Sequence, residues 1–409
     1  MKKPNGFLYF IFYILIYPFL KICFRLRVDR ADYHPPDGPF VVVANHVSFM
    51  DFALVMLSIY PRRLNAVAAQ KFFFYRPLDR LLPLMGCIAK KLFDADAAAI
   101  KGIMGVIRSG GRLLLFPEGR CTTHGSYMGI HKANGKLLKK LAVPVVSCRI
   151  EGAYICMPFW RKGLRFGPVS VTLASLFTPE ELSDLSVDEV NRRLDRRLSG
   201  ADATAPPRLS VTLTARRLVE GLENILYICP ACGEEFTLAT AGNVISCAQC
   251  RAEAVMGRDG RLRWANGSVS ADAAPLPSTV AACFDGQWAT VMARLGDEAP
   301  LYEVAVSVRM AAAPGRGLAE CGRGMLRLDG EGWHFDGELA GAATALFFPL
   351  EGVPALPFDP ADNFQIYDRG QFYAFCPLDE AKACVKYAVL GECMYRRYAA
   401  HVQMTDCVS

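Results

Sequence analysis

The sequence predicts a mixed-sheet α/β domain, followed by a four-cysteine zinc ribbon and a small β-rich α+β domain. Two apolar, β-rich runs at 41–44 and 113–116 each break into polar side chains. Helical patterns alternate with further apolar runs as far as residue 200. Two Cys-x-x-Cys pairs follow, and then several short β-like runs. Alternating strands and helices are typical of a sheet covered on both faces.

The chain begins with an apolar segment, and we assign residues 1–30 to a membrane anchor. Gly6 to Leu20 is an uncharged stretch of 15 residues with seven aromatics, flanked by Lys2, Lys3 and Lys21. A helix of that length spans about 22 Å, which is less than the roughly 30 Å hydrocarbon core of a bilayer. We therefore expect a helix that enters one leaflet, with a complete span as the alternative.

Charge divides the chain into a basic front half and an acidic back half. Residues 1–220 carry 32 Lys and Arg against 17 Asp and Glu, and residues 221–409 carry 14 against 23. Together with the apolar N-terminus, the basic half favours an anionic membrane surface as partner. We do not expect nucleic acid as a partner, because no nucleic-acid-binding motif accompanies the charge.

Residues 31–200 form the predicted catalytic domain. The turn Pro35–Pro39 leads into its first strand, and Gly110-Gly111 ends a helix that covers the sheet. Strands are expected at 40–44, 64–69, 112–116, 143–150 and 169–173, and helices at 51–60, 97–109, 132–141, 178 onward and 186–199.

His46 and Asp51 follow the first strand and are the predicted catalytic pair. Residues five apart on a helix lie about 140° from each other around the axis, so these two side chains meet only if the chain turns between them. A carboxylate on one imidazole nitrogen fixes the tautomer and raises the basicity of the other nitrogen, which can then take a proton from an alcohol. The alternative is a loop histidine beside a helix-capping aspartate.

Three ordered motifs resemble the glycerolipid acyltransferases of the lysophosphatidate acyltransferase type. These are Asn45-His46 with Asp51, then Phe116-Pro-Glu-Gly-Arg120, then Val143–Val146, and the resemblance covers roughly residues 35–175. It implies that His46 and Asp51 perform acyl transfer. It also implies that the second motif and a segment between the two bind a phosphorylated acceptor.

The resemblance implies a substrate-binding set with two departures from the family pattern. Arg120 comes one place early, and Lys90 and Lys91 follow Gly86 where the family has an arginine six residues after the glycine. The segment from Lys71 to Gly86 is where related enzymes seat the acyl chain and contact lipid. The expected substrate-binding residues are Glu118, Gly119, Arg120, Gly86, Lys90, Lys91 and Lys71.

The expected reaction is attack of a lysolipid hydroxyl on an acyl thioester, most simply conversion of lysophosphatidate to phosphatidate. The co-substrate is acyl-CoA or acyl carrier protein, and the other partners are membrane lipids. We expect the protein to lie at the cytoplasmic face of a membrane. The resemblance implies that this membrane is the bacterial inner membrane. The alternatives are another lysolipid or an amino lipid as acceptor, and a non-catalytic lipid-binding scaffold.

Four cysteines predict a structural zinc site within residues 227–264. Cys229 and Cys232 form one Cys-x-x-Cys pair, and Cys247 and Cys250 form the second. Two such pairs can close a tetrahedral thiolate site around Zn²⁺ with no open coordination position, so the ion is expected to stabilise the fold. A redox pair is the alternative. The other cysteines lie mostly in apolar sequence, as buried free thiols of a reducing compartment do.

Two further segments complete the organisation of the chain. Residues 201–226 are expected to contain a linker and a short helix from about Ser210 to Asn224, and residues 265–278 a second linker. Residues 279–409 are expected to form the β-rich domain. Its strands are expected at 301–308, 325–328, 333–335, 345–349, 364–367 and 372–375, with a closing helix from Asp379 towards Ala400. In topology, several strands followed by one closing helix resemble a pleckstrin-homology or GRAM-type domain.

Overall fold

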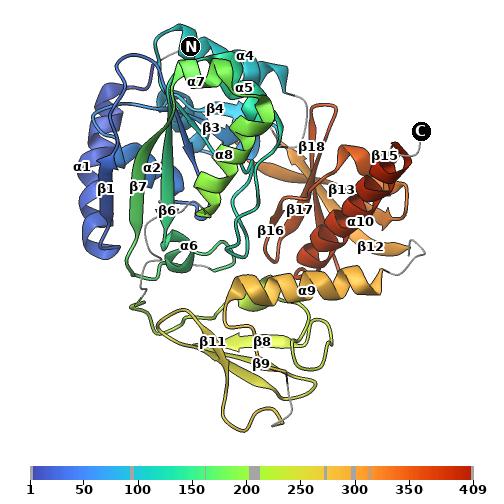
Figure 1. Ribbon diagram of the computed structural model, residues 1–409. Helices are drawn as coiled ribbons and strands as arrows, with labels where there is room; N and C mark the ends of the chain where they lie inside the picture. Colours follow the sequence, from blue (N-terminus) through green and yellow to red (C-terminus); the bar gives the residue numbers. More distant parts are fainter. Residues whose placement is uncertain are drawn as a thin grey trace.

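The chain folds into an α/β domain, a small four-stranded unit and a second β-rich domain (Figure 1). The computed structural model describes residues 3–92, 96–161, 163–201, 212–270, 274–295, 301–312 and 315–406. Residues 202–211 of the predicted linker segment 201–226 lie outside this description.

The first domain is built on a mixed seven-stranded sheet in the order β1-β7-β6-β2-β5-β3-β4. Neighbouring strands are parallel except β6 and β7. The strands are β1 Arg27–Asp32, β2 Val41–Ala44, β3 Asn65–Ala69, β4 Ile88–Lys90, β5 Leu113–Leu115, β6 Val145–Glu151 and β7 Ser170–Phe177. The helices are α1 Gly6–Cys23, α2 Asp51–Ser58, η1 Gln70–Phe74, α3 Leu78–Leu84, α4 Ala97–Arg108, α5 Ala133–Leu141, α6 Ala153–Cys156, α7 Pro179–Asp184 and α8 Val187–Ser199.

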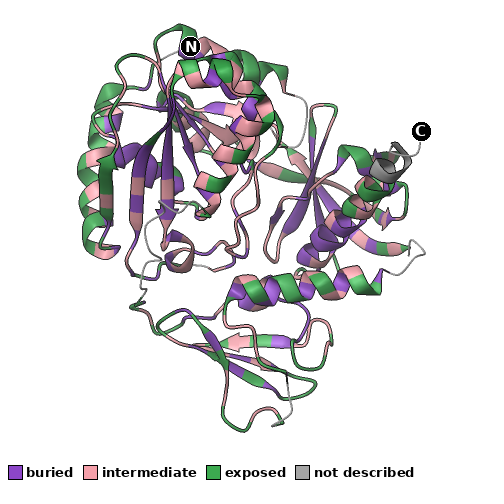
Figure 2. Cartoon of the chain, in the orientation of Figure 1, coloured by how far each residue is buried: buried purple, intermediate pink, exposed green. Residues whose placement is uncertain are grey.

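Helices cover both faces of this sheet, as the alternating pattern predicts. Every residue of the central strand β2 is buried, and a strand buried on both sides has the continuous apolar sequence seen here. Val42 and Ala44 point into a core shared with α1 and α2. Val41 and Val43 point into a second core, shared with α4, α5 and α8. Figure 2 shows the buried strands between partly exposed helices.

The N-terminal helix is longer than the sequence predicts and is packed on the domain. It runs to Cys23, so its 18 residues span about 27 Å. The Tyr9 hydroxyl accepts a hydrogen bond from the Leu64 amide, and the Tyr13 ring stacks on Tyr60 at 4.0 Å between centroids. Among the described residues it is the one helix long and apolar enough to cross a membrane, and 11% of it is buried.

The segment after this helix is a strand and not part of the anchor. Arg27 to Asp32 form β1, an edge strand paired with β7. Its sequence is polar because most of its residues are exposed. Arg30, at the end of the segment assigned to the anchor, donates hydrogen bonds to the Ser58 carbonyl.

The four-stranded unit contains the four clustered cysteines. Its antiparallel sheet has the order β11-β10-β9-β8. The strands are β8 Leu238–Ala241, β9 Val244–Cys247, β10 Glu253–Met256 and β11 Leu262–Trp264. The helix expected at 210–224 is wrong for the described residues, where one 3₁₀ turn, η2 at Leu222–Asn224, is present.

The C-terminal domain is an antiparallel seven-stranded sheet covered by one long helix. Its order is β15-β14-β13-β12-β18-β17-β16. The elements are β12 Tyr302–Ala311, β13 Leu318–Leu328, β14 Gly332–Leu339, β15 Ala342–Pro349, η3 Leu350–Gly352, β16 Phe358–Asp359, β17 Asn363–Asp368, β18 Gln371–Pro377 and α10 Ala383–Asp406. The predicted β-rich domain with a closing helix is therefore present, and the likeness to pleckstrin-homology or GRAM domains stays a prediction.

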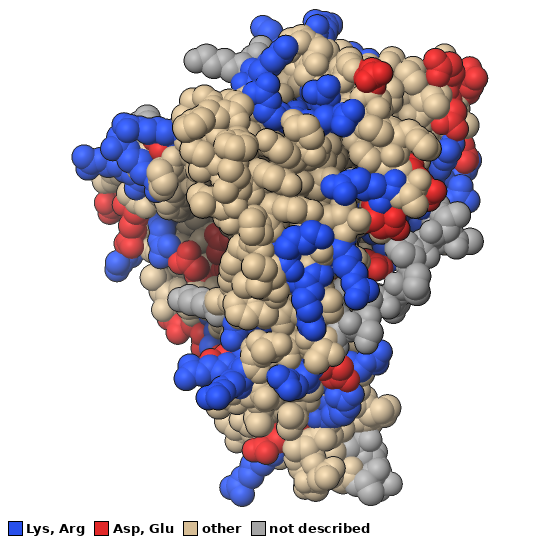
Figure 3. All heavy atoms as spheres, turned by 90° about the vertical axis from the view of Figure 1, so that its left-hand side faces the viewer, with Lys and Arg blue, Asp and Glu red and all other residues tan. Residues whose placement is uncertain are grey.

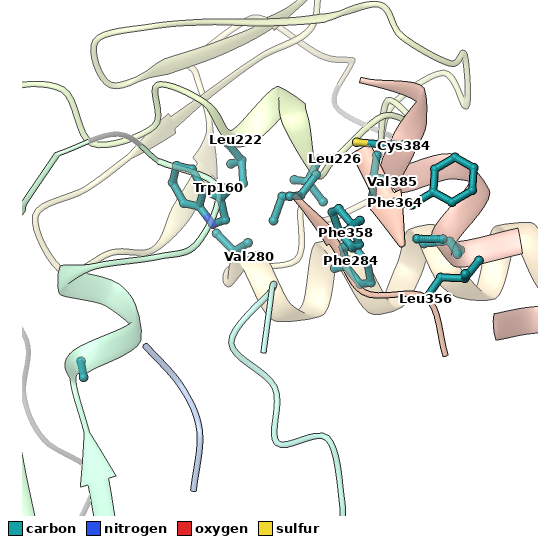
Figure 4. Close-up of a cluster of buried hydrophobic side chains, with 14 of the residues drawn as sticks. Trp160, Leu222, Leu226, Val280, Phe284, Leu356, Phe358, Phe364, Cys384 and Val385 are labelled. Carbon is teal, nitrogen blue, oxygen red and sulfur yellow. The ribbon is translucent and has the colours of Figure 1, made fainter. Parts of the chain in front are cut away.

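A helix that the sequence did not predict joins the three parts. Helix α9, Val280–Arg294, begins at the Thr279 cap and lies between the four-stranded unit and α10 (Figure 1). Apolar side chains from all three parts meet around it, including Trp160, Leu226, Phe284 and Phe364 (Figure 4). The larger of the two cores of the first domain therefore continues across the domain boundaries.

Gln287 of α9 is a buried polar link to the four-stranded unit. Its side-chain oxygen accepts the amides of Tyr227 and Ile228, and its nitrogen donates to the Ile225 carbonyl. A methionine has a similar shape and satisfies none of these three groups.

We predict that Gln287→Met speeds amide exchange at residues 225–228 by at least about ten-fold, because each buried group left unpaired costs about 1–3 kcal/mol. Hydrogen exchange with mass spectrometry measures this. Gln371→Met, at an exposed strand position, is the matched control. Unchanged exchange at 225–228 would show that Gln287 does not stabilise the junction.

Candidate active site

The two predicted motifs meet at one edge of the first sheet. Strands β2 and β5 are parallel neighbours, with Val43 opposite Leu115. Their carboxyl ends therefore place His46 and the 116–120 turn side by side, which is where open α/β sheets bind ligands. The Thr122 amide donates to the His46 carbonyl and ties the two loops together.

His46 and Asp51 are in contact, as predicted. His46 Nδ1 lies 2.9 Å from Asp51 Oδ2. The same oxygen accepts the amides of Val47 and Ser48. These bonds hold the turn that brings the pair together between β2 and the first residue of α2. Asp51 is fully buried, whereas the His46 side chain is 23% exposed.

This geometry leaves the second imidazole nitrogen, Nε2, available to accept a proton. Because Asp51 occupies Nδ1, the tautomer with a proton on Nδ1 presents a lone pair at Nε2. Burial raises the pKa of Asp51, and the three N–H groups at Oδ2 oppose that rise by stabilising the carboxylate. The imidazole ring also stacks on Phe116 at 4.1 Å between centroids, which fixes its plane.

Glu118 acts as a brace between two loops. Its Oε1 accepts the His46 amide at 2.7 Å, and its Oε2 accepts the Met128 amide at 2.9 Å. Burial raises the pKa of Glu118 to about 7. Both oxygens are engaged by the backbone, so the carboxylate positions the catalytic loop.

Cys121 lies next to the catalytic pair but is not prepared for thiol chemistry. Its sulfur is within 4.8 Å of ligand-type atoms of His46 and Asp51. Burial raises the pKa of the Cys121 thiol well above its usual range, so the neutral thiol dominates. This fits the interpretation of Cys121 as a neighbouring residue rather than a nucleophile.

Arg120 is engaged by the C-terminal domain. Its guanidinium donates to both carboxylate oxygens of Glu392 on α10, at 2.5 and 2.9 Å. Gly119, between Glu118 and Arg120, has a left-handed φ of +77°, and the space where a β-carbon would stand is open. Its amide donates to the Phe116 carbonyl in the turn.

The other predicted substrate-binding residues are dispersed. Lys71 pairs with Asp359 of β16 at 2.8 Å. Lys90 ends β4, and its amine donates to the Lys91 carbonyl. Gly86 precedes β4, so it lies at the opposite edge of the sheet from His46. Its carbonyl there accepts the Asn65 side chain. The structure does not bring Gly86 into the site.

Three residues of the site environment were not singled out for these roles from the sequence. The Asn45 side chain bonds both the amide and the carbonyl of Ile150, which ties the catalytic loop to β6. Glu392 pairs with Arg120, and His124 stacks on Phe284 of α9. Asn45 belongs to a motif and was visible on that ground. Glu392 and His124 carry no local signal, because their partners are distant in the sequence.

The four predicted cysteine ligands lie together. The sulfur atoms of Cys229, Cys232, Cys247 and Cys250 are all within 4.8 Å of one another. Two of the distances are 3.9 and 3.8 Å. A tetrahedral Zn²⁺ with Zn–S bonds near 2.3 Å places its sulfurs about 3.8 Å apart, so the cluster fits this ion. Sulfur atoms at these distances are not joined by a disulfide.

One face beside the site is apolar and rimmed with cations. The outward side of α1 exposes Phe7 (71%), Ile14 and Leu15 (64%), and Phe49 of the catalytic loop is also exposed. Figure 3 shows this side of the molecule, with a broad uncharged expanse bordered by Lys and Arg. An exposed apolar patch of this kind marks a membrane or protein contact.

Comparison with known proteins points to one family. Residues 25–151 match the family model described as Acyltransferase. A chloroplastic 1-acyl-sn-glycerol-3-phosphate acyltransferase of Brassica napus is 26% identical over 186 residues, which cover 44% of this chain and 52% of that protein. The human 1-acyl-sn-glycerol-3-phosphate acyltransferase alpha is 28% identical over 125 residues, covering 30% of this chain and 44% of that protein.

A solved structure was also found, the 1-acyl-sn-glycerophosphate acyltransferase of Thermotoga maritima. It is 20% identical with a TM-score of 0.41, covering 47% of this chain and 77% of that one. The chain spans about half the length of the curated relatives it matches. Residues 25–151, the part that matches this family model, carry His46, Asp51, Glu118 and Arg120.

Proposed function

We propose that the protein is a membrane-associated O-acyltransferase that moves a fatty acyl group from a thioester to the hydroxyl of lysophosphatidate, forming phosphatidate. The contact between His46 and Asp51 is the observation that carries this function. The relatives named above, all 1-acyl-sn-glycerol-3-phosphate acyltransferases, support the choice of acceptor.

In the proposed reaction His46 acts as general base. Its Nε2 takes the proton of the acceptor hydroxyl while the oxygen attacks the thioester carbonyl carbon. Asp51 holds the imidazole and stabilises the imidazolium that forms. The tetrahedral intermediate collapses with cleavage of the C–S bond, and the thiol of CoA or acyl carrier protein leaves with the proton from His46.

A second candidate is transfer to an acceptor without a phosphate monoester, such as another lysolipid or an amino lipid. The pairing of Arg120 with Glu392 favours it, because the guanidinium expected to bind phosphate already has an anionic partner. A non-catalytic scaffold has no comparable support, since the catalytic pair is in contact.

The membrane contact of this proposal is the α1 face. Because α1 packs on the domain through Phe12 against Phe52 of α2 and Tyr13 against Tyr60, it cannot cross a bilayer without drawing the domain in with it. We therefore place the helix in one leaflet with its exposed side in the lipid, as amphipathic interfacial helices lie. Lys71, which the structure pairs with Asp359, does not contribute to this face.

We predict that His46→Ala lowers kcat/KM for acyl transfer by about 10²–10⁴-fold, since that is the usual contribution of a general base. A labelled acyl thioester, with CoA and acyl carrier protein as carriers, is assayed against lysophosphatidate and phosphate-free acceptors. His34→Ala, in the exposed loop before β2, is the matched control. Equal rates for the His46 variant and the wild type would remove the catalytic assignment.

The four-cysteine cluster is proposed to hold a structural zinc ion. With four thiolates the ion has no open position, so it would stabilise the fold of residues 227–264. We predict that the purified chain carries about one zinc per molecule and that Cys250→Ser lowers this content and speeds amide exchange in β8–β10. Metal analysis measures the first effect. Cys321→Ser, outside the cluster, should retain the metal, and equal zinc in both variants would contradict the site.

For the membrane contact we predict that Leu15→Glu reduces flotation of the protein with vesicles containing phosphatidylglycerol. A carboxylate on the exposed side of α1 opposes both burial in lipid and attraction to anionic headgroups. Leu301→Glu, at an exposed site on the C-terminal domain, is the control for the loss of an exposed leucine. Undiminished flotation of the Leu15 variant would exclude this face as the anchor.

A further inference from the structure

Arg120 and Glu392 form a bidentate ion pair across 272 residues of sequence. Both side chains are largely buried, with 17% and 16% of their surfaces exposed. Arg120 belongs to the acyltransferase domain and Glu392 to the helix that covers the C-terminal sheet. The fork of a guanidinium binds carboxylate and phosphate in the same geometry, so the carboxylate occupies a position that suits a phosphate.

Two other cations of the predicted substrate-binding set also face the C-terminal domain. Lys71 is paired with Asp359. The Lys91 amine lies so close to Gly370 that a β-carbon there would stand 2.7 Å from it. The acyltransferase domain therefore presents three of its expected anion-binding groups to one neighbouring domain.

The ion pair forms part of the wall of a cavity of about 340 Å³ between the domains. The charged groups that line it are two guanidiniums and two carboxylates, those of Arg120, Arg396, Asp285 and Glu392. Arg396 lies one turn after Glu392 on α10, with its guanidinium 4.4 Å from the Trp288 ring centroid. Withdrawal of Glu392 would leave two cations facing one carboxylate, which is an environment for an anion.

The cavity is connected to the loop of the proposed catalytic base through Met128 and Glu118. Met128 lines it, and the Met128 amide donates to Glu118, whose other oxygen accepts the His46 amide. A head group bound at Arg120 is thus held by the loops that position His46.

We propose that the Glu392 carboxylate competes with the phosphate of the acceptor for Arg120 and so sets the affinity for phosphate-bearing acceptors. This inference rests on the proposed function, which supplies the acceptor. Binding then exchanges one anion for another at the same guanidinium. A phosphate monoester carries a charge of about −1.5 to −2 at neutral pH and has three acceptor oxygens, so it can displace a single carboxylate.

The competition has a defined effect on kinetics. A site that is free for only a fraction of the time has its apparent affinity reduced by that fraction. Glutamine at position 392 keeps the shape and removes the negative charge, so Arg120 is released more often. Acceptors that do not use Arg120 are unaffected.

The test compares Glu392→Gln with the wild type in the full chain. We expect the KM for lysophosphatidate to fall by about ten-fold, with kcat and the KM for monoacylglycerol little changed. In an Arg120→Ala background, Glu392→Gln should have no effect on KM. Glu235→Gln is the matched control. It removes the ion-pair partner of Lys386, which lies on α10 as Glu392 does, and it leaves Arg120 paired.

An unchanged or higher KM for lysophosphatidate in Glu392→Gln would overturn the competition. An equal fall in KM for both acceptors would also overturn it, because Glu392 would then close the site without discriminating phosphate. The same change in KM with Glu235→Gln would assign the effect to loosening of α10 and not to Glu392.

Binding of glycerol 3-phosphate separates this inference from the proposed function. Calorimetry should show tighter binding to Glu392→Gln than to the wild type and a loss of binding in Arg120→Ala. This measurement needs no turnover, so it decides the competition even if lysophosphatidate is not acylated. Retained activity in His46→Ala would instead overturn the proposed function alone.

Discussion

The active site depends on the buried carboxylate of Asp51. One of its oxygens accepts the imidazole of His46 and two consecutive backbone amides, so the carboxylate holds both the base and the turn that carries it. This turn also joins the central strand β2 to α2, whose side chains help to fill one of the two cores of the first domain. Loss of that anion would therefore affect the base, the loop and the packing of α2 together.

Sequence reasoning found the features whose partners are near in the chain or fixed by strand order. The His46–Asp51 turn and the 116–120 turn follow neighbouring parallel strands, so their meeting could be expected. The spacing of the cysteine pairs predicts a shared site, and their four sulfur atoms lie together in the structure. Most strands of both large sheets lie within a few residues of their predicted bounds.

The remaining features depend on contacts that leave no local pattern. Helix α9 was missed because its buried face includes the polar Gln287, while apolar alanines such as Ala282 and Ala289 lie on its exposed side, so the contrast between the two faces is weak. Strand β1 was not predicted because it is a mostly exposed edge strand with a polar sequence. The partner of Arg120 could not be inferred, since the pair joins two domains and either residue alone resembles a solvated charge.

Packing of α1 bears on the membrane contact proposed above. Besides the tyrosine contacts, the Asn5 amide donates to the Leu84 carbonyl and Arg63 donates to the Pro4 carbonyl, so the start of the helix is fastened to the globular body. The helix is therefore not a flexible tether but a packed part of the domain. In the proposed orientation, the docked helix would therefore fix the height and tilt of the candidate site above the lipid.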